Sequence, residues 1–204
     1  DIEGAIASEV TTSGASAITT ASLVPQKNGD HIDATSSLYG GTYNMLSVML
    51  PRFGIKTTFV DPSEPINFSK AVKKNTKLFF TESLGNPKLD VVDIEEISKY
   101  SKNHKIPLMV DNTVPSPALL NPIKHGANIV IHSLTKYING NGTSLGGVII
   151  DAGTFDWSND KFPEFTEPSP GYHGLVYSEV IGSASYIAKV RIEGLRDLGG
   201  SLSP

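Results

Sequence analysis

Short apolar runs that alternate with longer amphipathic segments are the feature that most constrains the fold of this chain. Several of these runs are β-branched or aromatic and carry polar residues only at their ends, as expected for strands that helices cover on both faces. The alternation is typical of βα units and predicts an α/β fold built on a mainly parallel sheet. The predicted strands are residues 7–11, 31–34, 57–60, 77–82, 107–111, 128–132 and 145–151.

The segments between these runs predict helices. Asp93 is a good N-cap, and Glu96 follows it at the spacing of a capping box. Between Lys136 and Gly147 there is room only for a brief turn, so the strand at 145–151 is predicted to be antiparallel to its neighbours. Prolines and an aromatic cluster predict a loop at 156–171. The predicted helices are residues 13–25, 42–50, 67–74, 93–104 and a long one at 177–198.

Composition argues against several classes of protein. The net charge of −4 and the lack of a basic patch with interleaved aromatic residues argue against nucleic acid as a partner. No apolar stretch approaches the length of a membrane span, and the absence of cysteine fits a reducing cytosol. The five histidines lack metal-ligand spacing. We therefore predict a cytoplasmic protein with no metal site and no contact with membranes.

Lys136 has the most informative local context. It follows the predicted strand 128–132 in the segment His132-Ser133-Leu134-Thr135-Lys136-Tyr137, and a glycine-rich stretch occupies residues 139–147. A lysine at a strand end beside such a loop is expected to be partly desolvated, which makes its amine available as a Schiff-base nucleophile. The hydroxyls of Ser133 and Thr135 are suited to bind phosphate oxygens. Together these residues suggest pyridoxal phosphate, and the alternative is an ordinary surface lysine.

Other predicted strand ends carry matching chemistry, because ligands of open α/β sheets bind at the carboxyl ends of the strands. The small residues at 12–16 lead into a helix whose N-terminus could bind phosphate, or they are only a cap. Tyr39, followed by Gly40 and Gly41, could lay its ring on a flat cofactor, or it packs in the core beside a simple turn.

Two further strand ends complete the set of groups that pyridoxal phosphate needs. Asp111 ends an apolar strand and would need a partner such as a protonated pyridine nitrogen; the alternative is a helix N-cap. Asn86 could donate to the phenolate oxygen of the ring, or it is only an Asn-Pro turn residue. Neither a phosphate-binding loop with the Gly-x-x-x-x-Gly-Lys pattern nor a dinucleotide fingerprint is present.

Three segments together resemble the cystathionine synthase/lyase family of pyridoxal-phosphate enzymes, also called the Cys/Met metabolism family. They are Ser37-Leu38-Tyr39-Gly40-Gly41-Thr42-Tyr43-Asn44, Val110-Asp111-Asn112-Thr113 and His132-Ser133-Leu134-Thr135-Lys136-Tyr137. The resemblance covers essentially the whole chain. It implies the aspartate-aminotransferase type of fold (fold type I), whose large domain has a seven-stranded, mostly parallel sheet with one antiparallel strand.

The resemblance also implies a role for each site residue. Lys136 forms the Schiff base with the cofactor, Asp111 pairs with the pyridine nitrogen and Tyr39 stacks on the ring. Asn86 reaches the phenolate oxygen. The phosphate is held by Gly14, Ala15, Ser133 and Thr135.

Within the family, the stretch 142–151 and the loop 155–174 resemble the sulfhydrylases more than the lyases. This implies γ-replacement on O-acetyl-L-homoserine by sulfide or a thiol, which gives homocysteine or methionine and acetate. The alternative is γ-elimination on methionine or cystathionine. The implied partners are an amino-acid substrate, sulfide or a thiol, and further copies of the chain in a dimer of dimers.

The resemblance also predicts how the chain divides. Residues 1–175 are expected to be the cofactor-binding large domain, shortened at its N-terminal side, and residues 176–204 a long helix that leads to a C-terminal domain. In the family, an N-terminal arm supplies a tyrosine and an arginine to the neighbouring phosphate, and the C-terminal domain supplies an arginine for the substrate carboxylate. We expect the 204 residues alone to bind the cofactor only weakly and not to catalyse the reaction.

Overall fold

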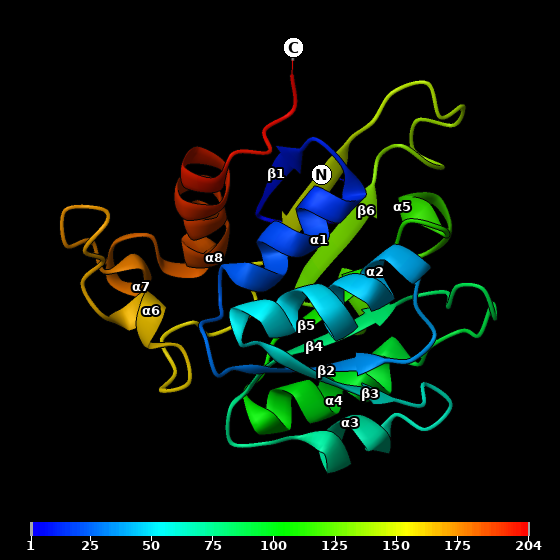
Figure 1. Cartoon of the computed structure of the whole chain (residues 1–204), viewed down its shortest axis with the longest axis horizontal. Coiled ribbons are helices and arrows are strands. Elements are labelled where there is room, and N and C mark those ends of the chain that lie inside the picture. The colour runs from blue at the N-terminus through cyan, green and yellow to red at the C-terminus, as the bar shows by residue number, and fades with distance from the viewer. Residues whose placement is uncertain (1, 204) are drawn as a thin grey trace.

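The computed structural model describes residues 2–203 and contains one seven-stranded sheet, with the strand order β1-β7-β6-β5-β4-β2-β3 (Figure 1). Strand β7 is antiparallel to both of its neighbours, β1 and β6. The other four neighbouring pairs, which join β6, β5, β4, β2 and β3 in that order, are parallel. The predicted sheet is therefore confirmed. The strands are β1 Ala7–Thr11, β2 His31–Thr35, β3 Lys56–Val60, β4 Thr76–Glu82, β5 Leu108–Asp111, β6 Ile129–Ser133 and β7 Gly147–Asp151.

The helices lie close to their predicted positions in the first half of the chain. The N-cap at Asp93 is confirmed, because its Oδ1 accepts a hydrogen bond of 2.9 Å from the backbone N–H of Glu96. The α-helices are α1 Gly14–Leu23, α2 Gly40–Asn44, α3 Ile66–Ala71, α4 Ile94–His104, α5 Ser116–Leu119, α6 Pro163–Thr166, α7 Tyr177–Val180 and α8 Ser185–Lys189. The π-helical segments are Met45–Met49 and Val190–Asp197, and the 3-10 turns are Leu50–Phe53, Pro122–His125 and Gly182–Ala184.

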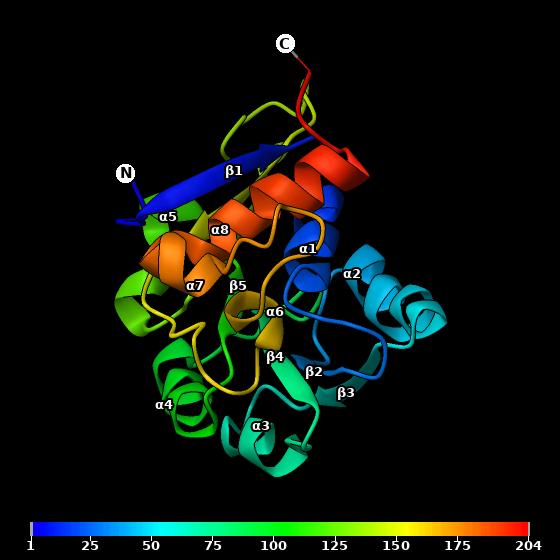
Figure 2. The ribbon, with the colours of Figure 1, turned by 90° about the vertical axis from the view of Figure 1, so that its left-hand side faces the viewer.

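The sheet separates two hydrophobic cores, and neighbouring residues of one strand face different cores. Phe80 and Ile129 pack on the side of α1, the Met45–Met49 segment and α8, whereas Phe79 and Val130 pack on the side of α3 and α4. Figures 1 and 2 show these helices on the two faces of the sheet. The period-two alternation of a strand thus produces a three-layer α/β/α fold. Within residues 2–203, no helix combines the length and the apolar character needed to cross a lipid bilayer.

Two predictions for the last fifty residues are wrong. The continuous helix at 177–198 is interrupted, because Gly182 adopts a left-handed φ of +65° between α7 and α8. The predicted loop at 156–171 contains α6, and its aromatic residues are structural. Trp157 stacks on Tyr186 of α8 with ring centroids 4.9 Å apart, and Phe162 and Phe165 are fully buried beside them. The aromatic cluster therefore extends the core.

One buried carboxyl group accepts no hydrogen bond within residues 2–203. Asp33 in β2 is 0% exposed, and neither carboxylate oxygen accepts a hydrogen bond from any described residue. His31 Nδ1 lies 3.6 Å from Asp33 Oδ1, but burial lowers the pKa of His31 to about 4, so this histidine is neutral at pH 7. Burial raises the pKa of Asp33 from 3.8 to about 7, against the opposing attraction of Lys73. Asp33 is therefore a destabilising element of the fold.

We expect Asp33→Val to stabilise the chain, and more so at about pH 8 than at about pH 4. The folded pKa lies above the unfolded one, so the folded chain retains a proton that the unfolded chain releases. Stability contributed at this site therefore falls as the pH rises from about 4 to 7 and then stays constant. The change in the pKa of Asp33 from 3.8 to about 7 corresponds to a change in the free energy of unfolding of about 4 kcal/mol at most. Urea unfolding across this pH range measures the difference between wild type and variant, and a difference independent of pH would contradict the assignment.

Candidate functional site

The carboxyl ends of five strands bring the predicted site residues to one edge of the sheet. Asp111 ends β5, and its register partner on β4 is Glu82. Ser133 ends β6, Tyr39 follows β2, and Gly14 begins the helix after β1. Because the strands that precede these residues point the same way, their ends lie along one edge, as expected for a ligand site of an open α/β sheet.

Asp111 is buried and held by its own turn. Its Oδ1 accepts hydrogen bonds from the backbone N–H of Thr113 at 2.9 Å and from the Thr113 hydroxyl at 2.5 Å. The N-cap alternative is wrong, because the next helix, α5, has Pro115 at its N-cap. Burial raises the pKa of Asp111, while the two hydrogen bonds from Thr113 and the nearby His132 lower it. Within residues 2–203, its Oδ2 forms no hydrogen bond. A cationic group at this oxygen would offset the cost of burying the carboxylate.

Thr113 links two strand ends, and the sequence analysis missed it. While its hydroxyl donates to Asp111, the same oxygen accepts a hydrogen bond of 2.8 Å from the backbone N–H of Ser133. The end of β5 is thereby fixed to the end of β6. The Asp-x-Thr spacing of residues 111 and 113 was an available signal, since a short polar side chain commonly bonds to the backbone two residues away.

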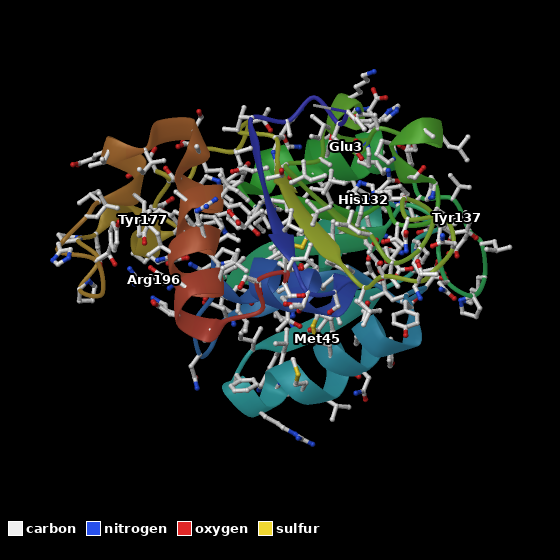
Figure 3. All side chains as sticks on the ribbon, turned by 90° about the horizontal axis from the view of Figure 1, so that it is seen from above. Glu3, Met45, His132, Tyr137, Tyr177 and Arg196 are labelled. Atoms are coloured by element: carbon white, nitrogen blue, oxygen red, sulfur yellow. The ribbon has the colours of Figure 1, made fainter. Side chains whose placement is uncertain are left out.

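His132 faces away from the site, on the other side of β6 from Ser133. It is fully buried, and its Nε2 lies 2.7 Å from Oε1 of the buried Glu3. Figure 3 shows these two side chains next to each other, far from Tyr177 and Arg196 at the opposite end of the molecule. The contact holds the segment before β1 against β6, so His132 supports the strand that carries Ser133 rather than the ligand.

The N-terminus of α1 lies directly against Ser133. Ser13 caps the helix by accepting a hydrogen bond of 3.1 Å from the N–H of Ser16. In the described part of the chain, the N–H groups of Gly14 and Ala15 form no hydrogen bond. These free donors, the positive end of the helix dipole and the Ser133 hydroxyl together make an anion-binding corner. Ser13 therefore serves as a helix cap, and the same segment can also bind a phosphate through the N–H groups of Gly14 and Ala15.

The close approach of α1 to β6 depends on glycine at position 14. A side chain there would place its Cβ 2.6 Å from the Cβ of Ser133 and 3.0 Å from its Cα. We expect Gly14→Ala to move the helix start away from Ser133, to lower stability by about 1–3 kcal/mol as overpacking does, and to weaken phosphate binding. Urea unfolding and titration with pyridoxal phosphate measure the two effects.

Gly171→Ala is the matched control for this substitution. No atom lies within 4 Å of the position that its Cβ would occupy. We expect the control to resemble wild type in both measurements. Equal stability and equal cofactor affinity of the two variants would show that α1 does not need its close contact with Ser133.

Tyr39 and Asn86 lie on loops at the same edge. Tyr39 is 57% exposed, so the alternative in which it packs in the core is wrong. Gly40 and Gly41 begin α2 rather than forming an isolated turn. Asn86 is partly buried, precedes a cis peptide bond to Pro87, and its side chain forms no hydrogen bond within residues 2–203. Its position in a turn is therefore established, and a ligand contact stays a prediction.

Lys136 differs from expectation in its burial. The sequence analysis expected a partly desolvated amine, whereas the side chain is exposed in the turn that follows β6. Its backbone is fixed, because its N–H bonds to Ser133 O at 3.3 Å and its carbonyl accepts from Gly140 at 2.8 Å. The Thr135 hydroxyl accepts a hydrogen bond of 3.1 Å from the N–H of Gly146. Thr135 therefore closes the glycine-rich loop instead of presenting a free hydroxyl.

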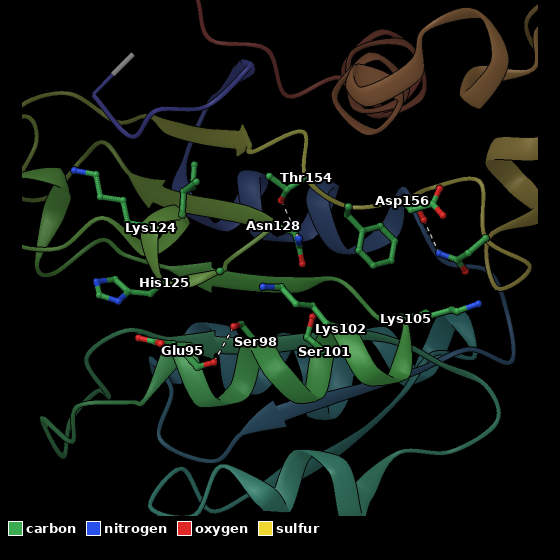
Figure 4. Close-up of a pocket in the computed structure, with 14 residues that line it drawn as sticks. Glu95, Ser98, Ser101, Lys102, Lys105, Lys124, His125, Asn128, Thr154 and Asp156 are labelled. Carbon is green, nitrogen blue, oxygen red and sulfur yellow. Dashed lines mark hydrogen bonds between the residues drawn. The ribbon is translucent and has the colours of Figure 1, made fainter.

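A separate cavity of about 570 Å³ lies at the other end of the sheet (Figure 4). Its lining includes Lys102 and Lys105 at the end of α4, and Lys124 and His125 at the end of a 3-10 turn. Basic side chains at helix C-termini complement the partial negative charge of the last carbonyls. Their presence is explained by the local helices, and the cavity does not include any predicted site residue.

Comparison with known proteins agrees with this arrangement. The family model described as Cys/Met metabolism PLP-dependent enzyme matches residues 1–204. The O-acetyl-L-homoserine sulfhydrylase of Leptospira meyeri is 53% identical over 211 residues, a match that covers 100% of this chain and 48% of that protein. The chain thus spans about half the length of the curated relatives that it matches.

Two solved structures share the fold. A putative O-acetylhomoserine (thiol)-lyase of Campylobacter jejuni, which contains a pyridoxyl-lysine phosphate, superposes with a TM-score of 0.95 at 38% identity, covering 100% of this chain and 50% of that chain. The O-acetylhomoserine sulfhydrylase of the methionine pathway of Wolinella succinogenes gives 0.86 at 37% identity, with 100% and 55% covered. The fold is therefore that of fold type I pyridoxal-phosphate enzymes. The chain belongs to the Cys/Met metabolism family of PLP-dependent enzymes.

Proposed function

We propose that this chain binds pyridoxal phosphate at the edge formed by α1, β4, β5 and β6. The main support for the proposal is that a buried carboxyl group, Asp111, and an anion-binding helix N-terminus lie at the same edge of the sheet. Asp111 is buried with Oδ2 unbonded in the described residues, and the free N–H groups of Gly14 and Ala15 lie beside Ser133. The first group suits a protonated pyridine nitrogen and the second a phosphate. The residues present therefore fit the cofactor.

Each residue then has a distinct task. Bound pyridoxal phosphate supplies an electron sink for the reaction. Asp111 keeps the ring nitrogen protonated, and Thr113 fixes the orientation of that carboxylate. Tyr39 contacts the ring face, and Asn86 donates to the phenolate oxygen. Lys136 would hold the cofactor through its aldehyde, and its amine would serve as the base for the proton at the substrate α-carbon.

We infer that the whole protein exchanges the acetate of O-acetyl-L-homoserine for sulfide, which gives homocysteine and acetate. Support comes from the names of the relatives, among them the homocysteine synthase of Schizosaccharomyces pombe at 47% identity. We also propose that it assembles as a dimer of dimers. Residues 176–204 begin with α7 and α8, which pack in the core, and we propose that they lead to a second domain.

Product analysis tests the reaction. The whole protein, of which this chain spans about half by comparison with its relatives, is incubated with pyridoxal phosphate and O-acetyl-L-homoserine, with and without sulfide. We expect homocysteine only when sulfide is present. Formation of 2-oxobutyrate at the same rate without sulfide would instead identify γ-elimination, and the absence of both products would contradict the proposed function.

A further inference from the structure

The buried carboxyl of Glu82 joins two parts of the site that come from distant segments. Glu82 ends β4 and is 6% exposed, and its Oε1 accepts a hydrogen bond of 2.7 Å from the backbone N–H of Tyr39. Its register partner on β5 is Asp111, so the two carboxyl groups leave the sheet on the same face. The backbone of Tyr39 is thereby held one strand away from Asp111.

A second hydrogen bond links the same loop to the loop that carries Asn86. The Ser37 hydroxyl donates to Asp90 Oδ1 at 2.7 Å, and the Asp90 carbonyl accepts from the N–H of Gly85 at 2.9 Å. The loops after β2 and β4 are therefore connected at two points, through Glu82 and through Asp90.

The ring of Tyr39 is constrained from another side by Gly41. A side chain at Gly41 would place its Cβ 2.6 Å from the ring atom Cε1 of Tyr39, so the ring lies close over this glycine. With 57% of the residue exposed, few other contacts restrict the ring. Its position thus depends on where Glu82 holds the backbone.

We propose that Glu82 is a positioning residue whose carboxyl holds the Tyr39 backbone and so keeps the Tyr39 ring at the edge of the cofactor site. The inference rests on the proposed function, because it assigns a role for that ring. The groups that face the carboxyl are Asp111 from β5, Asp90 from the following loop and the N–H of Tyr39.

The same surroundings make the contact sensitive to pH. Burial, reinforced by Asp111 and Asp90, raises the pKa of Glu82 from 4.5 to about 8, although the Tyr39 N–H lowers it. An ionised carboxylate accepts a stronger hydrogen bond than a neutral carboxyl group. The hydrogen bond from the Tyr39 N–H to Glu82 is therefore expected to become stronger as the pH rises through about 8.

Amide hydrogen exchange at Tyr39, measured in protein without added cofactor and corrected for intrinsic exchange, tests the inference. Loss of one hydrogen bond corresponds to about tenfold faster exchange, which we expect for Glu82→Ala. Glu82→Gln retains an acceptor oxygen, so we expect it to keep most of the protection while losing the rise in protection near pH 8. Asp151→Asn is the matched control, because Asp151 is another buried carboxyl that accepts a backbone N–H, from Gly153 at 2.8 Å. It should leave Tyr39 unchanged.

Unchanged exchange at Tyr39 in Glu82→Ala would overturn the inference, and so would equal losses in Glu82→Ala and Glu82→Gln. If Glu82→Ala does not fold, the pH profiles of wild type and Glu82→Gln decide, since identical profiles would also overturn it. Titration with pyridoxal phosphate then separates the two proposals. If the wild-type protein fails to bind the cofactor, the proposed function is contradicted. If wild type and Glu82→Ala both bind the cofactor with equal affinity, only the role of Glu82 is contradicted.

Discussion

In the whole protein, Asp111→Asn is expected to lower turnover by about a hundredfold or more while changing cofactor affinity much less. A neutral amide cannot keep the ring nitrogen protonated, so the electron sink weakens. The proposed phosphate contacts at Gly14 and the Ser133 hydroxyl do not involve the Asp111 carboxyl itself and are expected to remain. The substitution is also expected to leave stability unchanged or improved, because burial already raises the pKa of this carboxyl and its ionised form is costly.

Steady-state kinetics and cofactor titration of the variant provide the test. Asp33→Asn is the control, because Asp33 is also a buried carboxyl, but its register partner Phe79 faces the core on the side of α3 and α4. The control should keep normal turnover. Near-normal turnover of Asp111→Asn would mean that Asp111 serves only to order the turn at Thr113.

In the whole protein, Lys136→Ala is expected to abolish the absorbance band of the Schiff base with the cofactor and to lower turnover by at least about a thousandfold. General-base catalysis alone contributes about 10²–10⁴-fold, and the Schiff base is lost as well. The fold should not suffer, because Lys136 is exposed and the hydrogen bonds that it forms within residues 2–203 are made by its backbone. Exposed substitutions of this kind usually change stability by less than about 0.5 kcal/mol.

Lys124→Ala is the control for this variant, since Lys124 is an exposed lysine at the opposite end of the sheet. Absorbance and turnover should match those of wild type. A Lys136→Ala variant that retained the absorbance would place the Schiff base on another lysine.

The fold could be predicted from the sequence because its main signals are local. Strand β1 alternates in burial along its length, β5 and β6 contain apolar runs, and the short connection before β7 permits only an antiparallel neighbour. The cap at Asp93 likewise depends on residues a few positions apart. The grouping of Asp111, Ser133 and Gly14 followed from one topological rule, that parallel strands bring their carboxyl ends to the same edge.

The features that escaped prediction depend on contacts between distant residues. The aromatic residues of the 156–171 segment join the core because they meet Tyr186 of α8. Glu82 is part of the site because the N–H of Tyr39, which is 43 positions away in the sequence, bonds to it. The exposure of Lys136 also could not be derived locally, because burial of a turn residue depends on which other segments cover it. Such contacts leave no periodic signal in a sequence.

The central claim is that Lys136 binds pyridoxal phosphate. Its most direct test is to load the protein with the cofactor, reduce the complex with borohydride, digest it and locate the modified lysine by mass spectrometry. We predict a single pyridoxyl label on the peptide that contains Lys136. A label on any other lysine, or no stable label on protein that remains folded, would contradict the assignment.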